Sequence, residues 1–464
     1  MMIVRNKPLS PEFLCYMQDF ISKYNVPGPR YTSYPTIPHW HTEDHTESRW
    51  KQAVSDGFWR NGKEISLYIH LPFCESLCTY CGCTTRITQN HKVESKYITY
   101  LLKEWKLYLA TFGGQPIIRE IHMGGGTPTF FSAENLKTLI DGLTHEATLS
   151  DDFVFGFEGH PNNTTEEHLK TLADLGFTRM SLGIQDFDPE VQKIINRKQS
   201  FSQVKEITAL ARTYGFTSLN YDLIYGLPKQ TISGIAQTIA QTIALKPDRI
   251  AFYGYAHVPW VKAAQKSYEQ YLPSPAQRQK MYATGKKALM THGYHDIGMD
   301  HFALPTDSLY EAFATGKLHR NFMGYTTQDT NLLIGLGMSS ISDSWTAFSQ
   351  NEKLLSRYYE RLDRNELPIS RGHQLTTEDL IIRRHILNLM CNFETTWEVS
   401  ELLEIGFGFN TNLLATLVTD GFIQWTDTGI KINDAGKPFI RNICMALDAR
   451  LWRSSQQTSF SQTL

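Results

Sequence analysis

The chain is poor in cysteine, nearly balanced in charge and free of long apolar runs. Seven of its 464 residues are cysteine, and four of these lie between positions 74 and 83. Such a distribution argues against a disulfide framework and favours metal binding in a reducing compartment. The net charge of −2 argues against a general surface for nucleic acids or membranes.

The apolar content is high but dispersed. No run reaches the roughly 18 residues that a membrane-spanning helix needs, and the stretch from Met1 to Pro11 lacks the apolar core of a signal peptide. We therefore expect a cytoplasmic protein with neither a membrane nor a nucleic acid as partner. With 41% hydrophobic residues, the chain can bury a large core, either in two or three domains or in one α/β barrel with additions.

Short apolar runs alternate with longer periodic segments between about residues 62 and 255. The runs suited to buried parallel strands are Ile65–His70, Ile117–Met123, Phe153–Glu158, Thr178–Ile184, Ser218–Ile224 and Arg249–Tyr255. The segments with helical periodicity are Val93–Thr111, Ala133–His145, Glu166–Leu175, Phe201–Tyr214 and Ile232–Leu245. This alternation predicts a parallel α/β architecture with helices outside. Six units are too few for the usual eight-stranded barrel, so we expect an open (β/α)6 three-quarter barrel.

The flanking regions have different patterns. Prolines at 27, 29, 35 and 38 exclude a helix there and predict a fixed, extended arm. Near the other end, two helical segments precede a hairpin, which suggests a winged-helix-like domain, and that shape alone implies no DNA binding. We therefore predict four parts: an N-terminal arm with helices over 1–61, the barrel over 62–300, a connecting region over 301–369 that packs on the barrel, and a mostly helical C-terminal domain over 370–464.

Three cysteines follow the first predicted strand at a Cys-x3-Cys-x2-Cys spacing: Cys74, Cys78 and Cys81. Three thiolates can hold three irons of a 4Fe–4S cube and leave the fourth iron for another ligand, whereas ferredoxin-type motifs supply four thiolates. The alternative is a structural zinc site with Cys83 or His70 as the fourth ligand, and the spacing alone leaves it open.

Two further features accompany the cysteines. Tyr80 directly precedes the third cysteine, and Gly-Gly-Gly-Thr-Pro follows the second predicted strand at 124–128. Together with the cysteine spacing, they resemble the radical S-adenosylmethionine superfamily. In that superfamily, S-adenosylmethionine binds the fourth iron and is cleaved to a 5′-deoxyadenosyl radical. In such a barrel the carboxyl ends of the strands face one cavity, so we expect four further residues there. They are Glu158, Gln185, Asp222 and Ala256.

Longer strings, in order from about residue 24 to 446, resemble the oxygen-independent coproporphyrinogen III oxidases. They include Pro-Gly-Pro-Arg-Tyr-Thr-Ser-Tyr-Pro from 27, Leu-Tyr-Ile-His-Leu-Pro-Phe-Cys from 67, Gln-Asp-Phe from 185, Asp-Leu-Ile-Tyr-Gly-Leu-Pro-Lys-Gln from 222, Gly-Met-Asp-His-Phe from 298, His-Arg-Asn-Phe from 319 and Arg-Asn-Ile-Cys-Met from 441. The resemblance implies oxidative decarboxylation of two propionates of coproporphyrinogen III to vinyl groups, giving protoporphyrinogen IX. Cys83 and the proline-rich arm favour the oxidases over the related haem-chaperone branch.

The resemblance also implies roles for individual residues. Contacts to the S-adenosylmethionine on the cluster fall on Tyr68, Gly125, Glu158 and Ile341. Contacts to a second S-adenosylmethionine fall on Tyr80, Gly126, Thr127, Gln185, Arg197, Asp222 and Ala256. Tyr68 and Arg30 are the catalytic candidates, because Tyr68 adjoins the cofactor and a guanidinium on the arm can grip a propionate with two hydrogen bonds. The alternative for Arg30 is a salt bridge between arm and barrel. The implied partners are a tetrapyrrole substrate and an electron donor such as a flavodoxin or a ferredoxin.

One departure from the family pattern leaves the exact substrate open. The family has Glu-x-Asp-Pro-Arg after the third strand, and this chain has Glu158-Gly-His160-Pro-Asn162. The alternative hypotheses for the function are a radical enzyme that acts on haem or another tetrapyrrole, a non-catalytic haem chaperone on the same fold, and a zinc-stabilised barrel of unrelated function.

Overall fold

The computed structural model describes residues 20, 22–406, 408–454 and 460–463. The chain divides into two compact units, of which the larger is Trp40–Leu380 and the smaller joins Met1–His39 to Ile381–Leu464. In the described residues, every helix is too short or too polar to cross a membrane.

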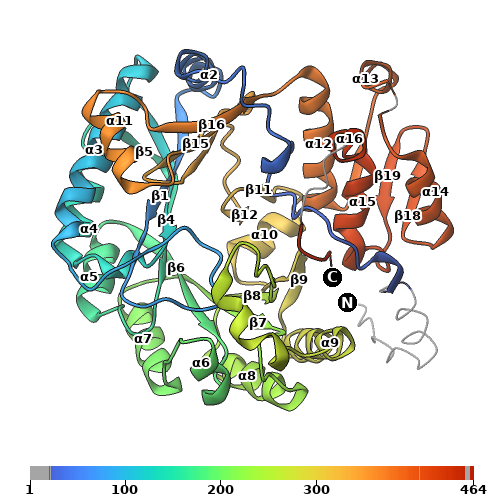
Figure 1. Cartoon of the computed structure of the whole chain (residues 1–464), viewed down its shortest axis with the longest axis horizontal. Helices are drawn as coiled ribbons and strands as arrows, with labels where there is room; N and C mark the ends of the chain where they lie inside the picture. The colour runs from blue at the N-terminus through green and yellow to red at the C-terminus, as the bar shows by residue number, and fades with distance from the viewer. Residues whose placement is uncertain (1–19, 21, 407, 455–459, 464) are drawn as a thin grey trace. The chain divides into compact units, whose positions relative to one another are not determined.

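Six parallel strands form the centre of the larger unit and lie side by side in sequence order. They are β1 (Glu64–Leu71), β4 (Ile117–Gly125), β5 (Thr148–Gly159), β6 (Phe177–Gln185), β7 (Ser218–Tyr225) and β8 (Arg249–Gly254). The helices between them are α3 (Val93–Phe112), α4 (Ala133–Thr144), α5 (Glu166–Asp174), α6 (Pro189–Ile194), α7 (Phe201–Thr213) and α8 (Ile232–Leu245). These helices surround the outside of the curved sheet (Figure 1). The predicted open (β/α)6 barrel is thereby confirmed.

The sheet continues beyond the six strands at both edges, to twelve strands in all. Next to β1 come β13 (Leu333–Leu336), β14 (Ile341–Asp343), β15 (Ala347–Asn351) and β16 (Ile369–Gln374); next to β8 come β10 (His301–Ala303) and β9 (His295–Gly298). β13 runs parallel to β1, and the remaining added strands are antiparallel to their neighbours. We predicted none of these strands, because most have only three to five residues and show no period.

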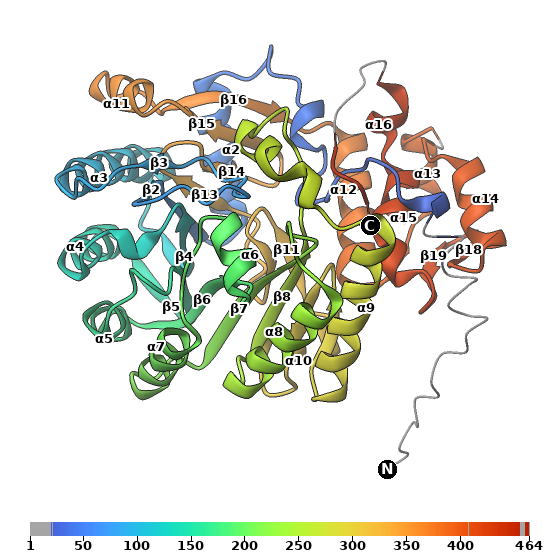
Figure 2. The same cartoon turned by 60° about the horizontal axis from the view of Figure 1, so that its bottom comes forward.

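Shorter elements complete the larger unit, and Figure 2 shows them from a second side. They are α2 (Glu47–Arg60), β2 (Phe73–Cys74), β3 (Arg86–Ile87), η2 (Pro128–Phe130), η3 (Ala263–Tyr271), α9 (Pro275–Thr291), α10 (Ser308–Ala314), β11 (His319–Asn321), β12 (Gly324–Thr326) and α11 (Leu355–Asp363). Several helices begin at a hydroxyl side chain that accepts from the first turn, which satisfies an otherwise unpaired N–H. These caps are Thr46, Ser132, Thr165, Ser200, Thr231 and Ser274.

Each central strand has an apolar outer face and a polar inner face. In β1, Leu67, Ile69 and Leu71 are buried in one core with helix residues such as Trp105 of α3. Burying each such side chain contributes about 1.5–3 kcal/mol. Strand side chains alternate between faces, so the residues between these point into the barrel. The inward residues include Tyr68, His70, His122, Glu158, Ser181, Asn220 and Asp222.

The smaller unit has a helical part and a three-stranded sheet in the order β17–β19–β18. Its elements are η1 (Ile37–His39), α12 (Thr377–Asn392, which starts in the larger unit), β17 (Glu394–Thr396), α13 (Val399–Glu404), α14 (Thr411–Thr419), β18 (Ile423–Thr426), β19 (Gly429–Ile432), η4 (Lys437–Phe439), α15 (Ile440–Leu447) and α16 (Ala449–Arg453). The predicted hairpin is confirmed as β18 and β19. β17 was not predicted.

The proline-rich arm packs within this smaller unit. The guanidinium of Arg441 donates from Nε to the carbonyl of Pro29 at 2.8 Å, and Asn442 Nδ2 donates to the carbonyl of Tyr24 at 2.9 Å. Tyr31 donates its hydroxyl proton to Asp448 at 3.0 Å. Prolines remove N–H donors but keep their carbonyls, so carbonyls of the arm are available to Arg441 and Asn442. The four-part division of the chain remains a prediction.

Candidate functional site

The three cysteines of the motif line one pocket of about 120 Å³ after strand β1. Cys74 ends β2, whose pairing with β3 closes the loop, and the other two cysteines follow in a turn. Cys74 Sγ lies 3.3 Å from Thr127 Oγ1, and Arg197 Nη1 donates to Cys78 Sγ at 3.5 Å. The glycine segment and the loop after α6 therefore both line this pocket.

The cysteine loop is held by residues distant in sequence. Thr79 N donates to the carbonyl of Ile195 at 3.1 Å, and Asn196 Nδ2 donates to the carbonyl of Leu77 at 2.8 Å. From η3, Gln265 Nε2 donates to the carbonyl of Tyr80 at 3.2 Å. The Tyr80 ring packs on an apolar cluster that includes Tyr255 and Tyr268. The loop is thus fixed from two sides.

The donor set fits a three-thiolate cluster better than a single zinc ion. No three of the described His, Cys, Asp and Glu side chains are close enough to enclose a single metal ion. A cube spaces its thiolates farther apart than one ion does, and Cys74, Cys78 and Cys81 share one pocket wall. His70 is engaged elsewhere, with Nε2 2.9 Å from the carbonyl of Thr84.

Cys83 lies outside the pocket lining and is exposed. Its thiol hydrogen-bonds to the sulfur of Cys81, and this bond lowers the pKa of Cys81 to about 6, against the opposing effect of burial. A thiolate, rather than a thiol, is the form that binds metal. Cys83 therefore supports a ligand thiolate without joining the pocket.

The three glycines at 124–126 are required by close packing. A Cβ on Gly124 would lie 2.7 Å from Glu158 Oε1, and one on Gly126 would lie 2.5 Å from the carbonyl carbon of Pro72. Gly125 has a φ of 108°, and a Cβ there would overlap the ring of His70. The end of β4 therefore lies directly against its neighbours, and the backbone N–H of Gly125 donates to Glu158 Oε2 at 3.4 Å.

The ends of β1, β4, β5 and β7 carry a row of polar side chains. The ring of Tyr68 stacks on His122, with centroids 6.2 Å apart, and His122 Nε2 lies 3.5 Å from Glu158 Oε1. Asp222 accepts from Ser181 Oγ at 3.0 Å. Neighbouring strands in register thus bring together residues more than 150 positions apart.

The two carboxylates of this row have opposite pKa shifts. Desolvation opposes ionisation of Glu158, but His122 and the N–H of Gly125 hold its pKa below the usual value. Burial, and then the charge of Glu158, raise the pKa of Asp222 to about 6. One carboxylate is therefore ionised while the other titrates near neutrality.

Gln185 and Arg197 meet at Gly183 near the end of β6. Arg197 donates from Nε at 3.0 Å and from Nη2 at 2.5 Å to the carbonyl of Gly183. A Cβ on Gly183 would lie 2.8 Å from Gln185 Nε2. Gly183 is also the register partner of Asp222. Three of the predicted contacts to a second cofactor molecule are therefore neighbours.

Three predicted site residues remain: Ala256, Ile341 and Arg30. Ala256 follows β8, and its carbonyl accepts from Gln265 Nε2 at 3.5 Å. Ile341 begins β14. A Cβ on Gly335 would lie 2.5 Å from the carbonyl oxygen of Ile341. Gly335 is in turn the register partner of Tyr68. Arg30 is exposed and belongs to the smaller unit, so its role toward this site stays a prediction.

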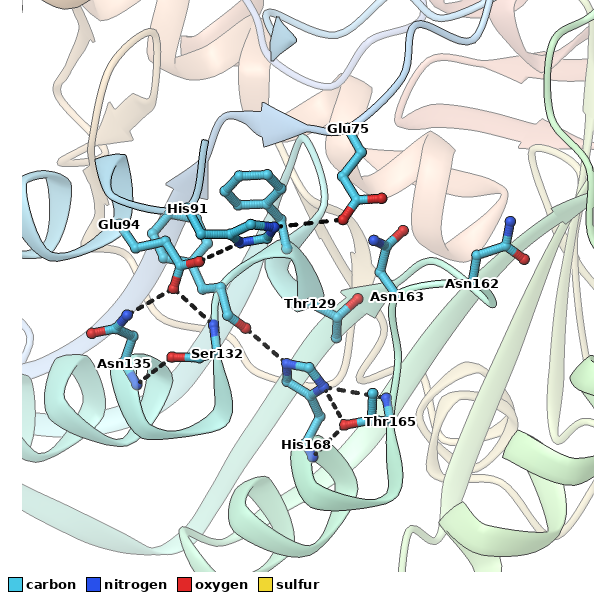
Figure 3. A pocket seen from close by; sticks show the side chains of 12 residues that line it. Glu75, His91, Glu94, Thr129, Ser132, Asn135, Asn162, Asn163, Thr165 and His168 are labelled. Atoms are coloured by element: carbon cyan, nitrogen blue, oxygen red, sulfur yellow. Dashed lines mark hydrogen bonds and ion pairs between the residues drawn. The ribbon is translucent and has the colours of Figure 1, made fainter. Parts of the chain in front are cut away.

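Figure 3 shows a second pocket, of about 460 Å³. It adjoins the first. The two share Glu75, Asn162 and Asn163. His91 lies between two carboxylates, with Nε2 3.6 Å from Glu75 Oε1 and Nδ1 2.7 Å from Glu94 Oε1. Polar side chains of this pocket are thus bonded largely to one another.

We did not predict the inner-face residues His122, Ser181 and Asn220. A signal was present, because polar residues recur at every second position in the apolar runs, as at 120 and 122 or at 220 and 222. Such alternation is typical of strands with one solvated face. We had treated these runs as uniformly apolar.

Comparisons with known proteins show what this chain is similar to. Residues 68–241 match the model of the radical SAM superfamily. The chain is 39% identical over 455 residues to the oxygen-independent coproporphyrinogen III oxidase of Pseudomonas aeruginosa, covering 96% of this chain and 98% of that protein. Identity to the Escherichia coli protein of the same name is 38%, over 96% of this chain and 97% of that protein. The solved structure of the Escherichia coli coproporphyrinogen III oxidase, described as a radical SAM enzyme, superposes with a TM-score of 0.84 at 37% identity, covering 90% of this chain and 97% of that one.

Proposed function

The chain belongs to the oxygen-independent coproporphyrinogen III oxidase family of radical S-adenosylmethionine enzymes, and from this premise we propose how its residues perform the reaction. It is an oxidoreductase of haem biosynthesis. The reaction converts two propionates of coproporphyrinogen III into vinyl groups and yields protoporphyrinogen IX. Each conversion removes one hydrogen atom, one carbon dioxide and one electron from the substrate.

Cys74, Cys78 and Cys81 bind the 4Fe–4S cluster in this proposal. The observation that carries it is that these three thiols line one pocket while Cys83 stays outside the lining. When bound, the cluster and S-adenosylmethionine supply a one-electron cleavage that yields a 5′-deoxyadenosyl radical. Arg197 reaches Cys78, so it balances the negative charge of the ligand thiolate.

The strand ends orient the cofactor. Glu158 is an ionised carboxylate next to Gly125 and the cysteine loop, and it accepts hydrogen bonds from the ammonium or ribose hydroxyls of the first S-adenosylmethionine. Tyr68 and Ile341, which border the same strand end, complete that contact. A second S-adenosylmethionine binds next to Arg197, Gln185 and Asp222, together with Tyr80, Gly126, Thr127 and Ala256. The support for this second contact is that Arg197, Gln185 and Asp222 all adjoin Gly183.

The substrate is held by cations, because a porphyrinogen carries several carboxylates. Arg30 binds one propionate through two parallel hydrogen bonds and keeps the reacting side chain in place. A flavodoxin or a ferredoxin supplies the electron for the cofactor. The polar inner face of the barrel lies beneath the site, so water must be displaced by the tetrapyrrole itself.

An anaerobic assay tests this function. The protein is purified without oxygen, reconstituted with iron and sulfide, and mixed with S-adenosylmethionine, a reductant and coproporphyrinogen III. We expect protoporphyrinogen IX and 5′-deoxyadenosine, detected by chromatography with fluorescence after oxidation of the porphyrins. Formation of 5′-deoxyadenosine without any vinyl product would contradict the substrate assignment. A product formed from haem, and none from coproporphyrinogen, would replace it with a haem-modifying reaction.

A further inference from the structure

Strand β16 carries an arginine on the inner face of the sheet. In the neighbouring strand β15, Ala347 belongs to the core on the outer face, so the side chains of Phe348 and Gln350 point inward. Gln350 is the register partner of Ile341 in β14 and of Arg371 in β16. Because residues in register share one face of a sheet, Arg371 points inward as Ile341 does.

A chain of polar contacts connects this arginine to the end of β1. Arg371 Nε donates to Gln350 Oε1 at 2.8 Å, and Gln350 Nε2 donates to the carbonyl of Ser339 at 3.0 Å. The hydroxyl oxygen of Ser339 lies 3.5 Å from His70 Nε2. The guanidinium of Arg371 also lies over the ring of Trp40, with Cζ 5.7 Å from the centroid. A hydrogen bond and a cation–π contact therefore restrict the rotation of this side chain.

Arg371 and Lys353, two residues after β15, form a pair of cations without a carboxylate. Burial lowers the pKa of Arg371, and burial, followed by the charge of Arg371, lowers the pKa of Lys353. Among the described residues, no acid forms an ion pair with either side chain. By contrast, Arg361 and Arg364 of the same region both pair with Glu366, at 2.9 and 3.0 Å. Two partly buried cations that repel each other indicate that a ligand supplies the anion.

The guanidinium of Arg371 has donors to spare for such an anion. A guanidinium has five N–H donors, and in the described part of the chain Gln350 takes only the one on Nε. The N–H groups on the two Nη atoms can bind both oxygens of one carboxylate through parallel hydrogen bonds. The ammonium group of Lys353 adds a second positive charge. The pair therefore fits a carboxylate ligand.

We propose that Arg371 and Lys353 form a subsite for a propionate of the tetrapyrrole that does not react. In the sheet order, β13, β14 and β15 separate β16 from β1. The distance along the sheet is therefore about four strand spacings, or roughly 19 Å, and inward-pointing side chains shorten it to the scale of a tetrapyrrole. A propionate held at this subsite leaves another one near Tyr68, at the end of β1.

A subsite at this distance suits a reaction that occurs twice. Two propionates of coproporphyrinogen III are converted, and the others remain carboxylates throughout. A cation pair far from the reacting atoms can therefore hold the substrate before and after each step. This inference deepens the proposed function and rests on it for the identity of the substrate. The other source of a carboxylate is S-adenosylmethionine, and the experiment separates the two.

Binding of matched probes tests the subsite. The variants Arg371→Gln and Lys353→Gln each remove one charge of the pair, and Arg364→Gln, the control, removes the same charge from an arginine that is paired with Glu366. The probes are coproporphyrin III, its tetramethyl ester, which keeps the ring but has no carboxylate, and S-adenosylmethionine. Dissociation constants are measured anaerobically by equilibrium dialysis in one detergent-containing buffer, on protein of equal iron content.

The expected result is a loss confined to the carboxylate-bearing porphyrin. Arg371→Gln should weaken binding of coproporphyrin III by about ten- to a hundred-fold, and Lys353→Gln by about three- to ten-fold, because charge-assisted hydrogen bonds are lost. The ester and S-adenosylmethionine should bind every variant within about two-fold of wild type. Arg364→Gln should match wild type with all three probes. In turnover, Arg371→Gln should raise KM for coproporphyrinogen III more than it lowers kcat, because the contact is to a group that does not react.

Other outcomes overturn the proposal. The subsite is rejected if Arg371→Gln binds coproporphyrin III as tightly as wild type does, or if the acid and the ester weaken together. A loss with S-adenosylmethionine alone would assign the two cations to the cofactor. Should Arg371→Gln fail to fold, Lys353→Gln and Arg371→Lys, which keeps the charge but not the two-pronged geometry, should still weaken the acid selectively.

Product formation by wild type decides the proposed function separately. If wild type forms protoporphyrinogen IX while Arg371→Gln binds coproporphyrin III normally, only the subsite is refuted. If wild type acts on haem instead, the same comparison is made with haem and its dimethyl ester, because haem also carries propionates. An equal affinity of wild type and Arg371→Gln for haem would then refute the subsite as well.

Discussion

The site has two walls that differ in charge and in support. The loop wall consists of the cysteine loop and residues 194–198, and it presents thiols and the cation Arg197. The strand wall consists of the ends of β1, β4, β5 and β7, and it presents the acids Glu158 and Asp222. The loop wall is held by side chains from distant elements, such as Gln265. The strand wall is held by its neighbours in the sheet, such as Ser181.

This difference matches the chemistry of a zwitterionic ligand. S-adenosylmethionine carries a carboxylate, an ammonium group and ribose hydroxyls, which need a cation on one side and acceptors on the other. A wall held by a sheet is rigid and suits orientation, whereas the cysteine loop keeps its position through side chains from distant elements. The two walls can therefore be tested separately, because a substitution in one wall should leave the contacts of the other wall intact.

The largest expected effect is on the loop wall. Replacing Cys74, Cys78 or Cys81 by Ser should abolish cluster binding and S-adenosylmethionine cleavage, because an incompletely ligated cube does not persist. Cys83→Ser is the matched control and should keep the cluster, since this thiol lies outside the pocket lining. Iron, acid-labile sulfide and the visible absorption band are measured after anaerobic reconstitution. Loss of iron in the Cys83 variant alone would contradict the assignment of three ligands.

The next effect concerns Arg30, which belongs to neither wall. Arg30→Ala should lower porphyrinogen turnover by roughly ten- to a hundred-fold, because a charge-assisted contact to a propionate is lost. Arg30→Lys keeps the charge but not the two-pronged geometry, and should fall in between. Cluster content and uncoupled 5′-deoxyadenosine formation, measured in the same samples, should match wild type. Unchanged turnover in Arg30→Ala would make the arm a packing segment only.

The sequence predicts where the residues of the strand wall lie in the fold, and for a physical reason. Parallel strands joined by helices all end at one edge, so Glu158, Gln185 and Asp222 could be placed near that edge from their positions alone. The three cysteines could be assigned because thiolate spacing within one loop is local information. The neighbours of these groups could not be assigned. Whether Glu158 meets His122 depends on strand register, which short apolar runs do not reveal.

The contacts of the loop wall and the strands at the sheet edges could not be predicted from the sequence. The contact of Arg197 with Gly183 joins a loop to a strand end, and no periodicity encodes it. Strands β13 to β16 are too short for a two-residue period to stand out, yet β13 pairs directly with β1 and places Ile341 near Tyr68. Long-range pairing, rather than local propensity, decides such elements.

The strand wall should respond to pH through Asp222, whose pKa burial raises to about 6. The carboxylate accepts from an ammonium or hydroxyl donor more strongly than the neutral acid does, so cofactor binding should tighten about ten-fold from about pH 5 to about pH 7. The stability contribution runs the other way. It is fully present below the unfolded pKa of 3.8 and is lost as pH rises through about 6.

Asp222→Asn is the control for this pH effect. The variant should bind S-adenosylmethionine weakly at every pH and should lose the ten-fold step. Its free energy of unfolding should also lack the corresponding decline with rising pH. Dissociation constants and urea midpoints are measured across the same buffers. A step that persisted in Asp222→Asn would assign the titration to another group, and the strand wall would then act through a different side chain.

The smallest effect tests how the loop wall is held. Lys262, at the start of η3, donates from Nζ to the carbonyl of Cys83 at 2.9 Å. A single hydrogen bond of this kind contributes about 0.5–1.5 kcal/mol, so Lys262→Met should speed the loss of iron to a chelator by about two- to ten-fold while its melting temperature changes little. Lys266→Met, an exposed lysine of the same element, is the control and should behave as wild type. If both variants lost iron at the wild-type rate, Lys262 would not help to hold the cysteine loop, and its support would come from other contacts such as that of Gln265.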